Sequence, residues 1–327
     1  MAQTGTDTGF AAQTIRAGGL VAFATETVYG LGADATNADA VVKIFEAKKR
    51  PLFDPLIVHI ASLNQLDQLV INQPPLLKVL ANNFWPGPLT LLLPRNADVI
   101  PDLVTSGLEE VGIRIPNQPL ALEFLNAAGC PVAAPSANLF GQISPTTAAH
   151  VDEQLGDSVD YILDGGPCDV GIESTILRIV DDQNLQVLRY GGIAIDDIRQ
   201  LLPKVKVEQA TAVIDQHEVQ APGQLQRHYA PRTPMVLRDH PVAVQGKRCG
   251  LLSYTPQQAQ DQFTAVEILS DQTSDLKAQM VESAKRLFAA MRRLDAQSLD
   301  LIVAKPFPEI GLGRALNDRL QRASEAN

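Results

Sequence analysis

Hydrophobic residues follow two patterns along the first part of the chain. Short apolar runs of strand length occupy residues 20–24, 56–60, 89–93, 111–115 and 132–134. Between these runs, apolar residues at helical spacing predict helices, one with Asn37 as its N-cap and one over residues 119–128 with Gly129 as its C-cap. Residues 175–180 and 185–189 predict a hairpin. This alternation predicts an α/β domain with a twisted, mixed, open sheet.

Two further segments follow this domain. Residues 209–234 have no clear period but contain Ala221-Pro222-Gly223 and Ala230-Pro231, which predicts an ordered connector. Alternation then resumes, with strands expected over residues 249–253, 263–268 and 299–304 and helices over residues 276–294 and 314–323. The predicted organisation is therefore a main domain (1–208), a connector (209–234) and a second, smaller three-layer α/β domain (235–327).

The composition is typical of soluble globular proteins, with 45% hydrophobic and 20% charged residues. No apolar run approaches the ~20 residues that span a membrane. The first ten residues have neither the basic nor the apolar part of a secretory signal, so we expect a cytoplasmic protein with no membrane partner. Cys130, Cys168 and Cys249 form no CxxC pair, and we expect buried free thiols rather than disulfides or a zinc site.

Negative charge is concentrated in the main domain and the connector. The net charge is −10, and residues 1–232 carry 15 Lys and Arg against 26 Asp and Glu. An RNA-binding module without catalysis would need cations to neutralise phosphates and aromatic residues to stack on bases. The acidic main domain and the aromatic content of 5% argue against that class, so we expect little intrinsic RNA affinity.

Polar residues gather where the predicted elements end. Residues 25–27, Thr-Glu-Thr, follow the first strand, and Lys48-Lys49-Arg50 ends the first helix before Pro51, which disfavours the helical conformation at Arg50. His59 lies within the second strand. Hydroxyls, a carboxylate, three cations and an imidazole would thus meet in the crevice where open α/β sheets bind ligands.

Each of these residues also has a simpler interpretation, which the residues alone leave open. Lys48 and Arg50 would complement the dipole of their helix, and His59 would be a hydrogen-bonded core histidine. Ser136 and Asn138 would form a turn after a strand, and Ser144 would be a helix N-cap.

A dinucleotide-binding motif is a second functional alternative. We expect residues 29–32, Tyr-Gly-Leu-Gly, to turn the chain. Residues 30–35 fit G-x-G-x-x-A between a strand and a helix, with Asp54 some twenty residues further on. However, residues 25–29 separate the strand from the first glycine, where the motif expects an immediate turn. This spacing argues against an NAD-dependent dehydrogenase. The P-loop pattern GxxxxGK[ST] does not occur in the sequence.

A set of motifs, taken together, resembles the YrdC-type L-threonylcarbamoyladenylate synthases: TETVYGLG, KIFEAKKRPLFDPLIVHI, GIRIP, APSAN, ISPT, ESTIL, VLRYGG and PGQLQRHYAP. The resemblance is close over residues 10–232 and looser beyond, where the chain is similar to the extra domain of the long form. It implies a nucleotidyltransferase that makes L-threonylcarbamoyl-AMP and pyrophosphate from L-threonine, bicarbonate or CO2, and ATP. The product would serve threonylcarbamoyladenosine modification of tRNA through a separate transferase. Mg2+ would accompany ATP, without metal ligands of the protein's own.

The resemblance also implies which residues bind each substrate. It places ten residues on ATP: Lys48 and Arg50, which would also be catalytic, and Asp54, Glu110, Ser136, Asn138, Ser144, Arg189, His228 and Tyr229. It places five residues on threonine: Thr27, His59, Arg114, Ala134 and Ser174. Asp54 stands where the family usually has asparagine, and it puts a negative charge where a neutral amide would bind phosphate more easily.

The connector carries more functional groups than a spacer needs. Arg227, His228 and Tyr229 are consecutive, whereas passive linkers favour Gly, Ser and charged residues without an aromatic. Pro222 and Pro231 would stiffen the two ends. We therefore predict that residues 221–231 fold over the nucleotide as a lid and exclude water from a hydrolysable mixed anhydride.

Overall fold

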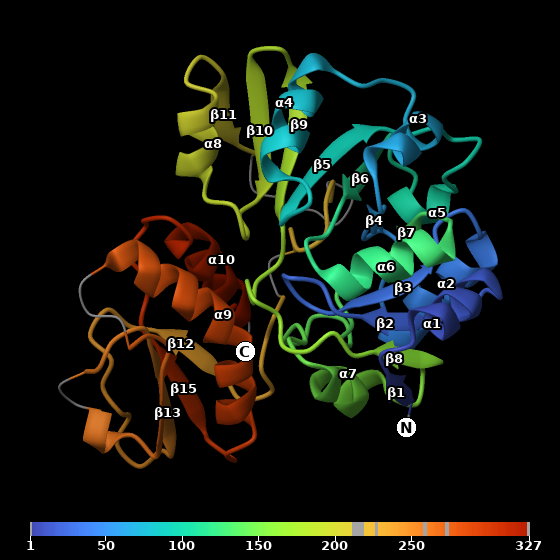
Figure 1. Ribbon diagram of the computed structural model, residues 1–327. Coiled ribbons are helices and arrows are strands. Elements are labelled where there is room, and N and C mark those ends of the chain that lie inside the picture. The colour runs from blue at the N-terminus through green and yellow to red at the C-terminus, as the bar shows by residue number, and fades with distance from the viewer. Residues whose placement is uncertain (1, 211–218, 226–227, 258–259, 272–274, 326–327) are drawn as a thin grey trace.

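The computed structural model describes residues 2–210, 219–225, 228–257, 260–271 and 275–325, which form two α/β domains (Figure 1). An eleven-stranded sheet organises the first domain. Its strands are β1 (Gln3–Gly5), β2 (Val21–Phe23), β3 (Gly30–Asp34), β4 (Ile57–His59), β5 (Leu89–Pro94), β6 (Glu110–Arg114), β7 (Val132–Ala133), β8 (Tyr161–Leu163), β9 (Thr175–Asp181), β10 (Asn184–Arg189) and β11 (Lys206–Gln209).

The sheet is mixed, as the sequence predicts. Its strand order is β1-β8-β2-β3-β7-β4-β6-β5-β9-β10-β11. The pairs β4–β6, β5–β9 and β10–β11 are parallel, whereas β4–β7, β5–β6 and β9–β10 are antiparallel. Because neighbouring strands run both ways, the ends of distant segments meet at one edge of the sheet.

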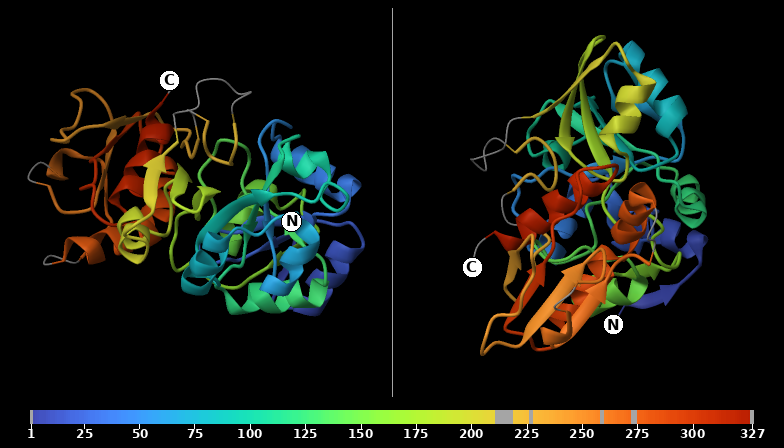
Figure 2. Two further views of the ribbon diagram at one scale, coloured as in Figure 1. Left: turned by 90° about the horizontal axis from the view of Figure 1, so that it is seen from above. Right: turned by 90° about the vertical axis from the view of Figure 1, so that its left-hand side faces the viewer.

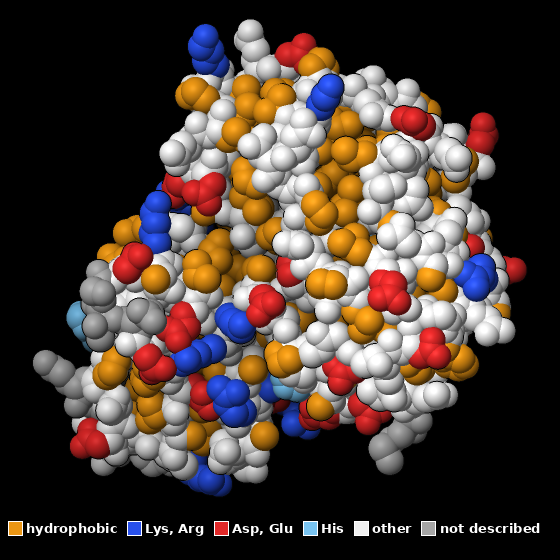
Figure 3. All heavy atoms as spheres, viewed as in Figure 1, with side chains coloured by type: hydrophobic (Ala, Val, Ile, Leu, Met, Phe, Trp, Pro, Cys, Tyr) orange, Lys and Arg blue, Asp and Glu red, His pale blue; other side chains and the backbone are white. Residues whose placement is uncertain are grey.

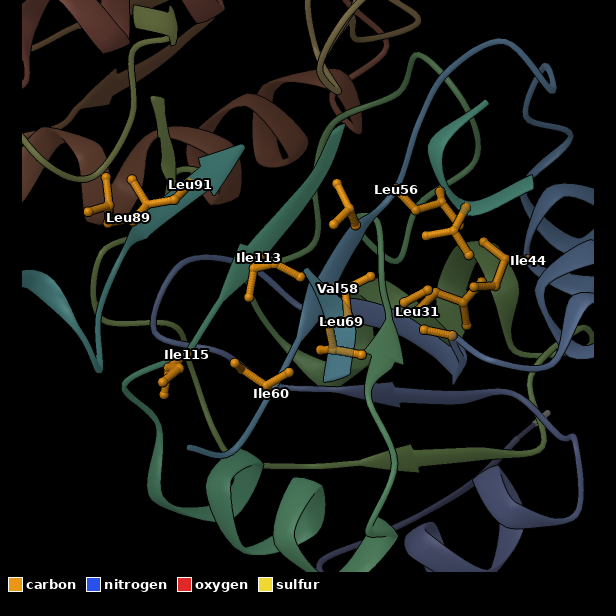
Figure 4. Packing of buried hydrophobic residues seen from close by; sticks show 14 of the residues in the cluster. Leu31, Ile44, Leu56, Val58, Ile60, Leu69, Leu89, Leu91, Ile113 and Ile115 are labelled. Atoms are coloured by element: carbon orange, nitrogen blue, oxygen red, sulfur yellow. The ribbon is translucent and has the colours of Figure 1, made fainter. Parts of the chain in front are cut away.

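Helices cover this sheet and bury its apolar side chains. They are α1 (Thr8–Arg16), α2 (Ala38–Lys48), α3 (Leu66–Leu69), α4 (Pro75–Phe84), α5 (Asp102–Thr105), α6 (Pro119–Ala128), α7 (Ala148–Leu155) and α8 (Ile195–Leu201), with a 3-10 turn η1 (Leu63–Gln65). Asn37 caps α2 through its side chain, as predicted, whereas Thr147 rather than Ser144 caps α7. Figure 4 shows Ile44 of α2 in the same packed cluster as Leu31, Val58 and Ile113.

The glycine pair that resembles a dinucleotide motif lies inside a strand. We expected residues 29–32 to turn the chain, but Gly30 and Gly32 belong to β3, which pairs antiparallel with β2. The turn comes earlier, where Thr25 Oγ1 donates to Val28 O over 2.6 Å. Gly32 permits close packing, since a Cβ there would lie 2.8 Å from Val132 Cγ1. This geometry rules out the dinucleotide interpretation.

The second domain is built on a smaller, fully parallel sheet. Its strands β12 (Met235–Leu237), β13 (Cys249–Ser253), β14 (Ala265–Ile268) and β15 (Leu301–Ala304) follow the order β12-β15-β13-β14. Helices α9 (Leu276–Asp295) and α10 (Gly313–Ser324) lie between this sheet and the first domain (Figures 1 and 2), and a 3-10 turn η3 (Gln260–Gln262) precedes β14. The fold class predicted from the sequence is thus confirmed.

The two domains contact each other along α9 and α10. Lys285 Nζ lies 2.7 Å from Asp169 Oδ1, and Arg292 Nη2 donates to Ile143 O over 2.5 Å. Gly171 has φ +78°, and a Cβ on it would lie 2.4 Å from the carbonyl oxygen of Ala284 in α9. The loop before β9 therefore packs directly on the backbone of α9.

The surface of the second domain carries charges of both signs. In Figure 3, blue and red side chains intermingle over the second domain, at the lower left. The visible face of the first domain shows more apolar surface. Within the described residues, no helix is long and apolar enough to cross a bilayer.

Candidate active site

A small cavity lies where the ends of β2, β4, β6 and β10 meet the connector. Its volume is about 40 Å³, which is room for about one water molecule. Ten of the predicted site residues line it: Thr27, Arg50, His59, Arg114, Ala134, Ser136, Ser174, Arg189, His228 and Tyr229. The structure therefore brings together residues that are far apart in the sequence, from both the first domain and the connector.

One wall combines a guanidinium with neutral polar groups. Arg114 Nη1 donates to Thr27 Oγ1 over 2.9 Å, and its Nη2 lies 2.6 Å from Glu26 Oε1. Burial, together with the charge of Arg114, lowers the pKa of His59 to about 3, so this imidazole is neutral. Ala134 contributes a buried, small side chain to the same wall. This wall therefore combines one cation, Arg114, with uncharged side chains that can form hydrogen bonds.

Ser174 connects this wall to Arg189. Its Oγ lies 2.7 Å from Thr90 Oγ1 and accepts from Arg189 Nη2 over 3.1 Å. Arg189 also donates to the carbonyl oxygens of Ser174 and Pro222, at 3.1 and 3.0 Å. The guanidinium of Arg189 is thereby fixed between the end of β10 and the connector.

The cations that end α2 lie beside the cavity. Arg50 Nη2 lies 2.9 Å from Asp54 Oδ2, and Arg50 also donates to the carbonyl oxygens of Asp54 and Pro55. Lys48 is buried and donates through Nζ to the carbonyl oxygens of Ser136 and Asn138. Burial, and then the charge of Arg50, lower the pKa of Lys48 well below its usual range. Left-handed Lys49, with φ 52°, ends the helix and separates the two side chains.

Five predicted ATP residues do not form part of the cavity wall. Lys48, Asn138 and Ser144 are buried behind it, and Asp54 is held against Arg50. Glu110 is half-buried and pairs with Arg178 at 2.6 Å, on a different part of the sheet. The structure thus places Asp54 as a partner of Arg50, which accounts for a carboxylate at this position.

The described part of the connector packs into the cavity. His228 and Tyr229 are buried, and their ring centres lie 4.1 Å apart. His228 also faces Phe140 at 6.0 Å, and Tyr229 stacks on Phe288 of α9 at 5.7 Å. Tyr229 has φ 61°, a strained backbone conformation for a large residue. Arg227 lies outside the described residues.

Helix α10 holds this segment from the second domain. Arg322 Nη1 donates to the carbonyl oxygens of Gln224 and Leu225, at 2.8 and 2.5 Å. The amide of His228 donates to Arg322 O over 3.3 Å. The described part of the connector therefore lines the cavity and is hydrogen-bonded to the second domain.

Sequence reasoning assigned no partner to three buried charged residues around the cavity, although it expected the Glu26 carboxylate to lie in the crevice. Glu26 pairs with Arg114, and Glu173 lines the cavity and pairs with Arg319 of α10. Glu173 belongs to the motif ESTIL, and a carboxylate within a mainly buried motif is a signal that we used for Glu26 but not for Glu173. Arg319 lies in an amphipathic helix, where nothing in the local pattern marks one arginine as buried.

Comparisons with known proteins extend over both domains. The family model described as telomere recombination, named for Sua5, YciO and YrdC, matches residues 13–191. The model described as threonylcarbamoyl-AMP synthase, C-terminal domain, matches residues 193–325. A threonylcarbamoyl-AMP synthase of Bacillus subtilis is 42% identical over 325 residues, which are 96% of this chain and 92% of that protein.

Solved structures agree with this assignment. A crystal structure of Pyrococcus abyssi Sua5 complexed with L-threonine matches with a TM-score of 0.87 and 35% identity, covering 99% of this chain and 97% of that one. Escherichia coli YciO, at 22% identity and a TM-score of 0.50, shares the fold of the first domain. The chain therefore belongs to the Sua5, YciO and YrdC family, in the form that carries the threonylcarbamoyl-AMP synthase C-terminal domain.

Proposed function

We propose that this protein is an L-threonylcarbamoyladenylate synthase, which makes L-threonylcarbamoyl-AMP and pyrophosphate from L-threonine, bicarbonate or CO2, and ATP. One observation carries the proposal. A single cavity joins a wall suited to a small polar amino acid, around Arg114, to a wall suited to phosphates, around Arg50 and Arg189. Family membership and the near full-length match to a threonine-bound relative support the same activity.

The wall around Arg114 matches the groups of threonine. Its guanidinium would be a bidentate partner for the carboxylate, and Glu26 holds the guanidinium in place at 2.6 Å. Thr27, Ser174 and the neutral His59 supply hydroxyl and imidazole groups that both donate and accept, as the threonine hydroxyl requires. Ala134 leaves space where a larger side chain would fill the wall.

The opposite wall suits the nucleotide and the transfer step. In the proposed reaction the amine of threonine adds to CO2 and loses a proton, or condenses with bicarbonate and releases water, to form a carbamate. A carbamate oxygen then attacks the α-phosphorus, the bond to the bridging oxygen breaks, and pyrophosphate leaves. Arg50 and Arg189, with Lys48 and Ser136 next to them, stabilise the charge that develops on the phosphate oxygens. The carbamate is already an anion, so this step needs no strong general base.

Magnesium belongs to this proposal as part of the substrate MgATP. Each of the three carboxylates described around the cavity is paired with an arginine: Glu26 with Arg114, Asp54 with Arg50, and Glu173 with Arg319. Among the described residues, no group of three or more His, Cys, Asp or Glu side chains is placed to hold a metal ion. These residues therefore do not fit a magnesium site of the protein's own.

The closed connector implies that substrates enter through its movement. The cavity of about 40 Å³ is much smaller than the ~300–1,000 Å³ of typical ligand pockets. ATP would therefore be admitted when residues around His228 and Tyr229 move away from Arg50, and closure would then exclude water from the mixed anhydride. This is the role proposed for the connector as a lid. The product would pass to a separate tRNA threonylcarbamoyl transferase, in the cytoplasm.

Mass spectrometry of the reaction products tests the proposal. Purified protein with ATP, Mg2+, L-threonine and bicarbonate should yield threonylcarbamoyl-AMP and an equal amount of pyrophosphate. Omission of threonine or of bicarbonate should abolish the product, and serine in place of threonine is a matched control for the side-chain methyl group. A folded protein that binds ATP and threonine but forms no adenylate would refute the proposal.

A further inference from the structure

Helix α10 buries an arginine behind the wall of the cavity. Arg319 is fully buried, and its Nε donates to Glu173 Oε2 over 2.9 Å. Its Nη1 donates to Asp318 Oδ2 over 2.8 Å, and its guanidinium carbon lies 5.0 Å from the centre of the Tyr229 ring. A buried charge is stable only when it is paired, so this contact is a point at which the second domain completes the first.

Glu173 is the residue that needs this arginine. It lines the cavity with 5% of its surface exposed, and its Oε1 accepts from Ser144 Oγ over 2.5 Å. The three arginines that line the cavity bond to other groups: Arg50 to Asp54, Arg114 to Glu26, and Arg189 to Ser174 and Pro222. Without Arg319, Glu173 would lose its ion-pair partner and remain an anion in the wall of a pocket that must accept phosphates.

We propose that Arg319 is a positioning residue for the ATP site, which neutralises the Glu173 carboxylate and holds it against Ser144. The proposal rests on the function proposed above as far as ATP is concerned. Arg319 does not line the cavity, so its effect on the nucleotide passes through Glu173. The second domain thereby contributes to the binding of an anionic substrate, beyond holding the connector.

Dissociation constants of the full-length protein for ATP and for threonine, measured by isothermal titration calorimetry, test this role. Arg319→Met should weaken ATP binding by about tenfold or more, because like charges in one site repel, and should change threonine binding much less. Arg319→Lys keeps the charge and should restore most of the ATP affinity. The double variant Glu173→Gln, Arg319→Met removes both charges and should bind ATP more like Glu173→Gln alone.

Arg314→Met is the matched control. Arg314 is on the same helix and also pairs across the domain boundary, with Asp196 at 3.3 Å, but it does not line the cavity. Its loss should leave both dissociation constants unchanged. Equal weakening of ATP and threonine binding in Arg319→Met, or the same weakening in Arg314→Met, would assign Arg319 to domain docking only and overturn the proposal.

Two further outcomes keep the test decisive. If Arg319→Met does not fold, the double variant replaces it, since it buries no unpaired charge: ATP affinity within a few-fold of Glu173→Gln supports the proposal, and a further large loss overturns it. The calorimetric readout is also independent of turnover. A protein that shows the predicted ATP selectivity but makes no threonylcarbamoyl-AMP would refute the proposed function and leave the role of Arg319 standing.

Discussion

Replacing Arg114 with glutamine distinguishes the threonine site from the ATP site of the proposed reaction. Arg114 is the cation of the wall assigned to threonine, and its contacts are to Thr27, Glu26 and the carbonyl oxygen of Gly87. Truncating one partner of a buried, hydrogen-bonded charge pair costs ~2–5 kcal/mol of binding. Since ~1.4 kcal/mol is a factor of ten, the KM for threonine should rise from about 30-fold to several thousandfold. The KM for ATP should change only a few-fold.

The same substitution also affects stability, and this effect must be measured separately. Arg114→Gln leaves the buried Glu26 carboxylate without its counterion, although the amide of Asn117 still donates to it over 2.9 Å. Loss of one partner of a buried ion pair lowers the unfolding free energy by ~3–5 kcal/mol. The double variant Glu26→Gln, Arg114→Gln removes both charges, so urea denaturation should show a smaller loss.

Steady-state release of pyrophosphate, with each substrate varied in turn, gives the required KM values. The double variant should regain stability without regaining threonine affinity, because the carboxylate of threonine still lacks a cation. Equal increases of both KM values, or an increase for ATP alone, would refute the assignment and place Arg114 on the nucleotide. Recovery of threonine binding in the double variant would show that Arg114 acts only through folding.

Three other predictions follow from the site. Arg50→Ala should lower threonylcarbamoyl-AMP formation by ~10²–10³, the range for one preorganised charge-stabilising donor, and near-normal turnover in a folded variant would make Arg50 only a helix cap. Tyr229→Ala in the full chain should weaken ATP binding. A chain ending at Pro234 should also lose activity, because it lacks Phe288 and Arg319, on which Tyr229 packs. An active truncated chain would show that the lid works without the second domain. His59→Gln should flatten the pH dependence of the unfolding free energy by up to ~1.4 kcal/mol per pH unit between pH 6.5 and about 3. Because burial disfavours the charged imidazole, the contribution of neutral His59 to the unfolding free energy is complete above pH 6.5 and is lost as the pH falls towards 3. If the variant showed the same slope of unfolding free energy against pH as the parent protein in urea titrations, this prediction would be wrong.

The sequence predicts elements best where apolar periodicity and end signals agree. The helix after Asn37 and the strand over residues 249–253 occur as expected, since a cap or an uninterrupted apolar run defines them locally. The expected turn at residues 29–32 was wrong because Gly30 and Gly32 are determined by close packing against Phe23 and Val132, which lie elsewhere in the sheet. Turn propensity alone does not carry that information.

The sequence motifs predict which residues belong to the site better than they predict how those residues are arranged. Ten of the residues selected from motifs line one cavity, which motif spacing alone does not show. The pairing of Arg114 with Glu26 was not predicted, because side-chain partners from different strands depend on the strand order. The pairing of Arg50 with Asp54, four residues further on, was not predicted because it depends on the loop conformation after α2. The pairing of Arg319 with Glu173 was not predictable either, because the two residues lie in different domains.

The contact at Gly171 limits how the protein moves. With no space for a Cβ between this loop and α9, the domains meet backbone to backbone, and a hinge between them would have to break that contact before ATP entered. We therefore predict that opening is local to the connector, as an unfolding event of low free energy, rather than a rotation of domains. Amide hydrogen exchange should then be fast in residues 219–225 and 228–231 and slow in α9 and α10. ATP would slow exchange in the connector and leave the helices unchanged.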